Sequence, residues 1–154
     1  MSLFIGDEQD EPVDTARLGQ LAAAVLKAEG LPADCEMAVI LVSADQIAEY
    51  NRQFMDREGA TDVLAFPLQN LEAGKVPPPV ANQPPLSLGD VFLCPAEIKR
   101  HAAREKVDFE DYLCLLAVHG ILHLLGYDHD DHLSARRMEE REEELLAMIG
   151  RGLS

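Results

Sequence analysis

The stretch EMAVILVS, residues 36–43, decides the fold class of this chain. Its apolar run is continuous and rich in β-branched side chains, which is typical of a strand that is buried on both faces of a sheet. Apolar residues at helical spacing predict helices on both sides of it along the chain, at residues 14–29 and 43–54. Ser43 is the expected N-cap of the second helix. A buried strand between two helices indicates a sheet with helices packed on it.

The rest of the chain also contains patterns typical of strands and helices. Strands are expected at residues 3–5, 61–66 and 87–94, and helices at residues 95–106, 108–126 and 133–149. This order implies an α+β fold with a single domain over residues 1–154, in which a small mixed sheet of about four strands is covered by about five helices. Residues 69–86, which contain the proline-rich run KVPPPVANQPP, are expected to form a flexible loop.

The composition argues against several classes of protein. With 154 residues, 47% of them hydrophobic, the chain is long and apolar enough for one packed core, so disorder is not expected. No apolar run approaches the ~20 residues of a membrane span, and the first residues do not resemble a signal peptide, so we expect a cytoplasmic protein without a membrane partner. Cys35, Cys94 and Cys114 are widely spaced and odd in number, which predicts reduced thiols in the core.

The net charge of −15 argues against non-specific binding of nucleic acid, because phosphate contacts usually come from lysine and arginine. It does not exclude specific binding, because the basic residues gather locally. Lys99, Arg100 and Arg104 all fall on the helix expected at residues 95–106. The densest acidic block, residues 139–144, is expected to be a solvated face of the last helix.

The stretch HGILHLLGYDH, residues 119–129, predicts a metal site. His119 and His123 are four residues apart, so on a helix they share a face and can converge on one ion. Gly126 can end the helix with a positive φ, and His129 follows three residues later as a third ligand. Three imidazoles with an open fourth position are typical of catalytic zinc, although nickel, cobalt or iron can also fit. Zinc lowers the pKa of a bound water toward ~7, which makes it a nucleophile.

Residues near the histidines refine this prediction. The same spacing occurs in metzincin proteases, but these carry a glutamate as general base directly after the first histidine, where this chain has Gly120. Peptide hydrolysis by that route is therefore not expected. Asp128 is either a partner that orients a ligand imidazole or a turn residue, and His132 is expected to be solvated rather than a fourth ligand. Asp130 and Asp131 are the expected caps of the last helix.

The histidine block resembles the signature H-G-x-L-H-L-x-G-Y-D-H of the YbeY family of bacterial endoribonucleases. Two other blocks agree in order and spacing. TDVLAFP at residues 61–67 is similar to the family's TDVLSFP-like block, and LGDV at residues 88–91, followed by Cys94-Pro95, is similar to its LGD and CP blocks. The resemblance covers most of the chain.

This resemblance implies a metal-dependent endoribonuclease that is specific for single-stranded RNA. It implies one zinc ion held by His119, His123 and His129. It also implies a role in 3′-end maturation of 16S rRNA and in ribosome quality control. The partners would be small-subunit rRNA, the small ribosomal subunit and assembly factors.

The chain departs from the family at one position. Many members carry an arginine before the TDVL block, and an alignment without gaps places Met55 there. Arg52 and Arg57 flank this position and are candidates for the missing phosphate contact. Three further candidates for contact with RNA phosphates are Lys99, Arg100 and Arg104.

We expect a cleft with the zinc at its floor and the strands that carry Asp62 and Asp90 as one wall. Asp62 is a candidate general base, with a capping role at the end of a strand as the alternative, whereas Asp90 is expected to be structural. Two other functions stay open. In the first, the chain is a ribosome-assembly or RNA-binding factor with a structural zinc; Met55 and the charge of −15 favour this alternative. In the second, the chain is a metal-dependent hydrolase of another substrate.

Overall fold

The computed structural model describes residues 2–78 and 81–153, and in these residues four strands form one mixed sheet in the order β1-β2-β4-β3. The strands are β1 (Ser2–Glu8), β2 (Glu36–Val42), β3 (Val63–Pro67) and β4 (Ser87–Leu93). β2 pairs in parallel with β1 and β4, while the edge strand β3 runs antiparallel to β4. The predicted α+β class and mixed sheet are confirmed, and β1 is longer than its short apolar run indicated.

Five helices occur in the same described residues, in the predicted order. They are α1 (Thr15–Ala28), α2 (Ala44–Met55), α3 (Pro95–Glu105), α4 (Phe109–Leu124) and α5 (His132–Leu153). Four of them have side-chain caps. Asp14, Ser43, Asp108 and Asp131 each accept a hydrogen bond from the backbone N–H of the residue three positions further on, at 3.0, 3.2, 3.0 and 2.8 Å. Pro95 begins α3, where its missing N–H costs no helix hydrogen bond.

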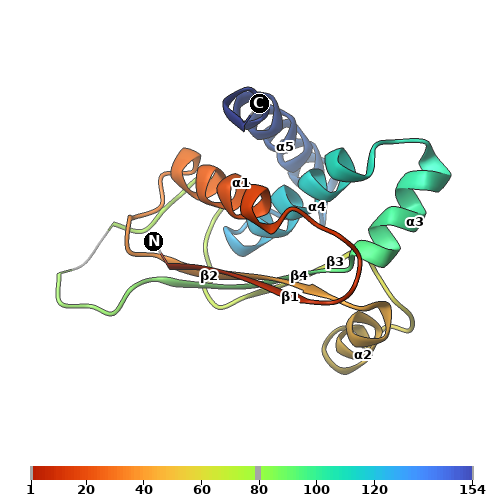
Figure 1. Ribbon diagram of the computed structural model, residues 1–154. Coiled ribbons are helices and arrows are strands. Elements are labelled where there is room, and N and C mark those ends of the chain that lie inside the picture. Colours follow the sequence, from red (N-terminus) through yellow and green to blue (C-terminus); the bar gives the residue numbers. More distant parts are fainter. Residues whose placement is uncertain (1, 79–80, 154) are drawn as a thin grey trace.

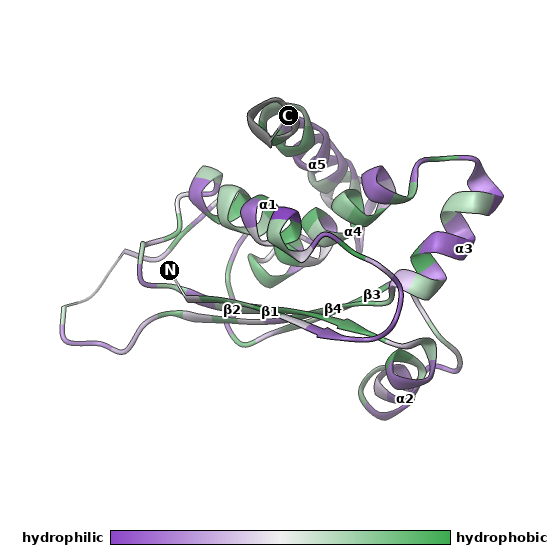
Figure 2. Cartoon of the chain, in the orientation of Figure 1, coloured by the Kyte–Doolittle hydropathy of each residue, from purple (hydrophilic) through white to green (hydrophobic). Residues whose placement is uncertain are grey.

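The helices form layers on the sheet (Figure 1). α1, α4 and α5 lie on one side of it, and α2 lies on the other. The strands are mainly apolar, whereas α3 and α5 carry many hydrophilic residues (Figure 2). Val39 and Leu41 of β2 and Ile121 and Leu122 of α4 are fully buried in the main core. Because α4 contacts the sheet, α1, α3 and α5, it is the central helix of the fold.

Gly120 allows α4 to lie tightly on the sheet. A Cβ atom at this position would lie 2.6 Å from Cγ1 of Val91 on β4 and 3.2 Å from Cγ2 of Val63 on β3. The first distance is too short for two carbon atoms, so only glycine fits without a shift of the buried valine. This packing holds His119 and His123, on either side of Gly120, close to the edge strand β3.

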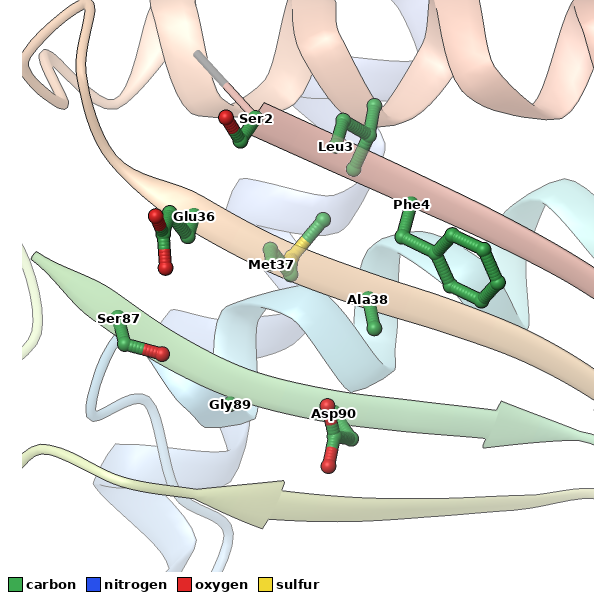
Figure 3. A pocket seen from close by; sticks show the side chains of 9 residues that line it. All are labelled: Ser2, Leu3, Phe4, Glu36, Met37, Ala38, Ser87, Gly89 and Asp90. Atoms are coloured by element: carbon green, nitrogen blue, oxygen red, sulfur yellow. The ribbon is translucent and has the colours of Figure 1, made fainter. Parts of the chain in front are cut away.

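The other face of the sheet is only partly covered. A small core of Val42, Ile47, Leu64 and Cys94 joins this face to α2. Away from α2, side chains of all three parallel strands line an open pocket, among them Phe4, Glu36 and Asp90 (Figure 3). Phe4 is 62% exposed there. The uncovered part of this face therefore presents both aromatic and acidic groups.

The segment predicted as a flexible loop, residues 69–86, makes fixed contacts in its first part. Leu71, Ala73 and Val76 pack against the main core, and the carbonyl oxygen of Ala73 accepts a hydrogen bond from Nη2 of Arg137 at 2.9 Å. Apart from an isolated bridge between Glu72 and Lys75, its described residues form no strand or helix.

The three cysteines are free thiols in the described structure, as predicted. Cys35 and Cys94 are buried and Cys114 is half-buried, and burial raises the pKa of each thiol. A search of the described helices finds none with both the length and the apolar character needed to cross a membrane.

Candidate metal centre

Three imidazoles meet at the C-terminal end of α4. The Nε2 atoms of His119 and His123 lie 3.2 Å apart, and the ring of His129 lies 4.9 Å from that of His123 and 5.8 Å from that of His119, between centroids. One nitrogen atom of each ring lies within 4.8 Å of the other two. Zinc–nitrogen bonds are about 2.0–2.1 Å long, so these three nitrogens can surround one ion after small rotations of the rings.

The turn after α4 brings His129 back to the helix. Gly126 has a φ of +96°, and a Cβ atom there would lie 2.1 Å from the carbonyl oxygen of Leu71. Both the positive φ and the close backbone require glycine. The next residue, Tyr127, donates its backbone N–H to the carbonyl of Leu122 at 3.0 Å and is itself buried. The predicted glycine turn is therefore present.

Tyr127 anchors this turn to α1 and α5. Burial, a hydrogen bond to Glu29 and the charge of that carboxylate together raise the pKa of the Tyr127 phenol to about 12. Glu29 in turn forms an ion pair with Arg141 of α5 at 2.9 Å, in which the glutamate side chain is only 8% exposed. The guanidinium of Arg137 lies 5.7 Å from the centre of the Tyr127 ring. The loop that carries His129 is thus fixed by groups from two helices.

Glu142 on α5 orients His119. Its Oε1 lies 2.5 Å from Nδ1 of His119, and Glu142 is buried. Because a carboxylate only accepts, Nδ1 carries the proton, and the lone pair of Nε2 faces His123. A carboxylate behind a histidine is a common partner of metal ligands in proteins. The prediction that residues 139–144 form a solvated face is wrong at Glu142, because it shares the buried side of α5 with Met138 and Leu145.

The electrostatic environment favours a neutral His123. Burial lowers its pKa, and the neighbouring His119 and His129 lower it further, because a second positive charge beside them is unfavourable. A neutral imidazole is the form that binds a metal ion. The donor set and its surroundings fit a divalent ion.

A cavity opens in front of the three histidines, around the edge strand β3. Its other wall is formed by the end of α2 and the loop after it, including Asn51, Met55 and Arg57. Asp56 ends α2 in the left-handed region, with a φ of 51°, and Nδ2 of Asn51 donates to the carbonyl of Gly59 at 3.0 Å. These two features fold the loop so that Arg57 lies on the cavity wall.

The structure separates the other predicted RNA contacts from this cavity. Arg52 pairs with Glu49, Lys99 with Glu11 at 3.1 Å, Arg100 with Glu97 at 2.5 Å, and Arg104 lies 3.8 Å from Glu105. Of the basic candidates, Arg57 is the one among the described residues that line the cavity. Its guanidinium has no ion pair in the described part of the chain.

Asp62 lies in a different cluster from the histidine triad. Its Oδ1 accepts a hydrogen bond from Nδ1 of His101 at 2.6 Å, and its Oδ2 accepts one from the hydroxyl of Tyr112 at 3.2 Å. Asp90 lines the pocket on the opposite face of the sheet. Although the neighbours of Asp62, Thr61 and Val63, line the histidine cavity, the carboxylate itself is not among its described lining residues.

The acidic residues after the histidines mostly shape the backbone. Oδ1 of Asp128 accepts from the backbone N–H of His129 at 2.6 Å, so Asp128 is a turn residue and does not orient the imidazole. Asp131 accepts from the backbone N–H of Ser134 at 2.8 Å and caps α5, as predicted, whereas Asp130 hydrogen-bonds the side chain of Asp128. His132 begins α5, is exposed and lies outside the triad.

The fold and the site together define a class: single-domain α+β proteins with three histidines around an open cavity, arranged to hold a metal ion. A profile of the family described as Endoribonuclease YbeY matches residues 4–150, which is nearly the whole chain. The chain therefore belongs to the YbeY family.

Individual relatives agree with this assignment. A protein of Thermobifida fusca named Endoribonuclease YbeY is 39% identical over 99% of this chain and 97% of its own length. One of Acidothermus cellulolyticus with the same name is 40% identical over 95% of this chain and 90% of its own length. The solution structure of TM1509 from Thermotoga maritima is similar with a TM-score of 0.60 and 28% identity, and covers 97% of this chain and 93% of that protein.

Proposed function

We propose that this chain is a zinc-dependent endoribonuclease that cuts single-stranded RNA in the cytoplasm. In this proposal it acts in 3′-end maturation of 16S rRNA and in ribosome quality control, with the small ribosomal subunit and assembly factors as partners. One observation carries the proposal: in a member of the YbeY family, three imidazoles meet at a cavity whose wall also carries Arg57, which forms no ion pair with the described residues.

The three histidines would hold the ion and the rest of the site would keep them in place. When bound, a zinc ion supplies Lewis acidity to a phosphoryl oxygen or lowers the pKa of a water. Glu142 keeps the proton of His119 on Nδ1, so Nε2 is available as a ligand atom. The Gly126 turn and buried Tyr127 hold His129 opposite α4. Three neutral nitrogen donors with an open position favour zinc over the oxygen-seeking ions magnesium and calcium.

Arg57 is the proposed phosphate contact in place of the arginine that Met55 replaces. It lies on the wall of the same cavity as the histidines, and its guanidinium is not occupied by a carboxylate of the described residues. A guanidinium can bind two phosphate oxygens at once and stays charged at all working pH values. Arg57 would hold the phosphodiester at the histidines and stabilise the charge that develops on it.

Asp62 does not fit the role of general base in its present position. Both carboxylate oxygens are engaged by His101 and Tyr112, and the side chain is 14% exposed. Asp62 would need to break both hydrogen bonds to reach a substrate in the histidine cavity. In this proposal it fixes the start of β3 and so supports the cavity wall.

Cleavage of a labelled single-stranded RNA tests the proposal. The samples are zinc-loaded protein, protein stripped by a chelator, stripped protein reloaded with zinc, and His123→Ala. His132→Ala is the matched control, because His132 lies close in sequence but outside the triad. We expect cleavage in the loaded, reloaded and control samples, and loss of at least a hundred-fold in the other two, which is about the effect of losing a principal catalytic group.

Three outcomes would contradict the proposal. Cleavage that survives both the chelator and His123→Ala would place the activity elsewhere. Well under one equivalent of metal in carefully prepared protein would overturn the zinc assignment. A zinc-loaded protein that cuts no RNA but co-sediments with small ribosomal subunits would favour an assembly factor with a structural zinc, which the charge of −15 supports.

A further inference from the structure

A row of aromatic rings connects α2 to the face of the sheet opposite α4. Tyr50 lies 4.9 Å from Phe92, Phe92 lies 5.6 Å from Phe66, and Phe66 lies 5.5 Å from Phe54, between ring centroids. The first three rings are partly buried, whereas Phe54 is 63% exposed. Neither of its aromatic neighbours is parallel to the Phe54 ring, with interplanar angles of 49° and 74°. Phe54 is therefore a fixed and largely free aromatic ring at the end of this row.

Phe54 precedes a residue on the wall of the histidine cavity, although Phe54 itself is not among the described lining residues. The next residue, Met55, lines that cavity, and so does Arg57. The aromatic partner of Phe54 is Phe66 on the edge strand β3. Its neighbours Ala65 and Pro67 line the cavity, whereas the ring of Phe66 lies on the other face of β3, with the small core that joins the sheet to α2. A strand of RNA with a phosphate at the histidines and Arg57 would pass Phe54 as it leaves the cavity around β3.

We propose that Phe54 is a stacking site for a base of the single-stranded RNA whose phosphate lies in the histidine cavity. This inference rests on the proposed function and adds how the substrate is held. Unpaired bases commonly stack on exposed aromatic side chains, and such stacking needs no particular base because every base has an aromatic face. The site would therefore favour single strands over duplexes, in which bases are already stacked.

The negative charge of the chain favours an uncharged contact with RNA. The net charge is −15, and Arg52, Lys99 and Arg100 are each paired with a carboxylate. Few cations are free to bind phosphates in the described part of the chain, and the rest of the surface repels a polyanion. Stacking contributes affinity without a charge on the protein, so Phe54 can supplement Arg57.

The experiment uses a property of the sequence: the chain contains no tryptophan. Phe54→Trp introduces a single fluorescent indole at the proposed site. Phe4→Trp is the matched control, because Phe4 is equally exposed, at 62%, but lies on β1 on the uncovered part of the sheet (Figure 3). Each zinc-loaded variant is titrated with a single-stranded phosphorothioate RNA, which resists cleavage, and with an abasic strand of the same length. Binding of dye-labelled RNA is followed separately by anisotropy.

We expect the RNA to quench the indole of Phe54→Trp along the same curve as the anisotropy, and the abasic strand to quench it little. The indole of Phe4→Trp should not respond. In cleavage assays, Phe54→Ala should raise KM about ten-fold with kcat nearly unchanged, and Phe54→Tyr should restore the normal KM, as stacking energies indicate.

Two outcomes overturn the inference and are distinguishable. In the first, the phosphorothioate RNA binds by anisotropy and unmodified RNA is cleaved, but neither indole is quenched or both are quenched equally, which removes Phe54 from the RNA path. The proposed nuclease would then stand. If the labelled RNA does not bind the zinc-loaded protein at all, the proposed function fails and the stacking site fails with it.

Discussion

Two histidines in this chain are each held by a carboxylate, but their second ring nitrogens have different neighbours. His119 has its Nδ1 at 2.5 Å from Glu142, and His101 has its Nδ1 at 2.6 Å from Asp62. Both clusters bring three potential ligand atoms within 4.8 Å of one another. The difference lies at the second ring nitrogen. Nε2 of His119 meets the imidazole of His123, whereas Nε2 of His101 lies 3.9 Å from the carboxylate of Glu97.

The surroundings of that nitrogen decide what each cluster can do. Arg100 lies 2.5 Å from the same oxygen of Glu97, and Tyr112 donates to the second oxygen of Asp62. The His101 cluster therefore satisfies its own charges and hydrogen bonds, and it ties the start of β3 to α3 and α4. In the described residues, the histidine triad is held from outside by Glu142 at His119 and by the backbone of Tyr127 at His123, and it faces a cavity. Close spacing of ligand atoms alone does not separate a metal site from a structural cluster.

Removing one histidine from each cluster gives the largest contrast. His119→Ala should reduce bound zinc from one ion per chain to well below one, because two imidazoles bind the ion far more weakly than three. His101→Ala should keep one ion per chain. Elemental analysis of zinc-loaded, dialysed protein measures both. Loss of zinc in His101→Ala with retention in His119→Ala would reverse the assignment of the two clusters.

Substitution of the carboxylate behind each histidine, Glu142 or Asp62, tests the same contrast through the affinity for zinc. Glu142→Gln should weaken zinc binding by about 10–100-fold, the usual effect of losing a carboxylate behind a ligand histidine. Asp62→Asn should leave zinc affinity unchanged. Competition with a chromophoric chelator gives both affinities. Equal affinities for Glu142→Gln and the unchanged protein would mean that Glu142 only fills space in the core.

The free energy of unfolding tests whether the His101 cluster stabilises the fold. Asp62→Asn should lower the free energy of unfolding by about 1–3 kcal/mol, because it weakens a partly buried pair of hydrogen bonds that joins three elements. Glu49→Gln, which breaks an exposed ion pair with Arg52, serves as the control and should change stability by less than about 0.5 kcal/mol. Urea unfolding of the zinc-free proteins measures both. An unchanged midpoint for Asp62→Asn would show that the His101 cluster does not stabilise the fold.

The smallest expected effect concerns the anchor of the metal loop at alkaline pH. The pKa of Tyr127 is raised to about 12 from its usual 10.0. The unfolded chain therefore loses this proton first, and the stability that the raised pKa contributes is complete below pH 10 and is lost as pH rises toward 12. The Tm of the unchanged protein should fall more steeply over this window than that of Tyr127→Phe. Parallel curves would show that the phenol is not protected in the folded state.

Much of the fold and part of the site follow from local patterns. The order of the nine elements in the described residues, the caps at Ser43 and Asp131, and the histidine spacing with its glycine turn all follow from short stretches of sequence. Glu142 was not predicted, because its role depends on how α5 packs on α4. Its position four residues after Met138 and three before Leu145, both buried, is the signal that could have identified it.

Which arginine lies on the wall of the histidine cavity also depends on tertiary structure. Arg52 and Arg57 both lie within three residues of Met55, yet Arg57 is the one that the backbone turn at Asp56 places on the cavity wall. The sequence likewise predicts basic side chains on α3 but not their carboxylate partners. Lys99 pairs with Glu11, a residue that precedes α1 and lies far away along the chain. Contacts of this kind have no local signature.

The packing of Gly120 has a consequence for how this fold can evolve. A peptidase of the metzincin type needs a glutamate at this position, and one codon change would supply it. Its Cβ would meet Val91 at 2.6 Å inside a close-packed core, so the new side chain demands smaller residues on β4 and β3 at the same time. Each of these changes made alone destabilises the chain before any new activity exists. The close packing of α4 on the sheet therefore opposes the evolution of a metzincin-type glutamate at position 120.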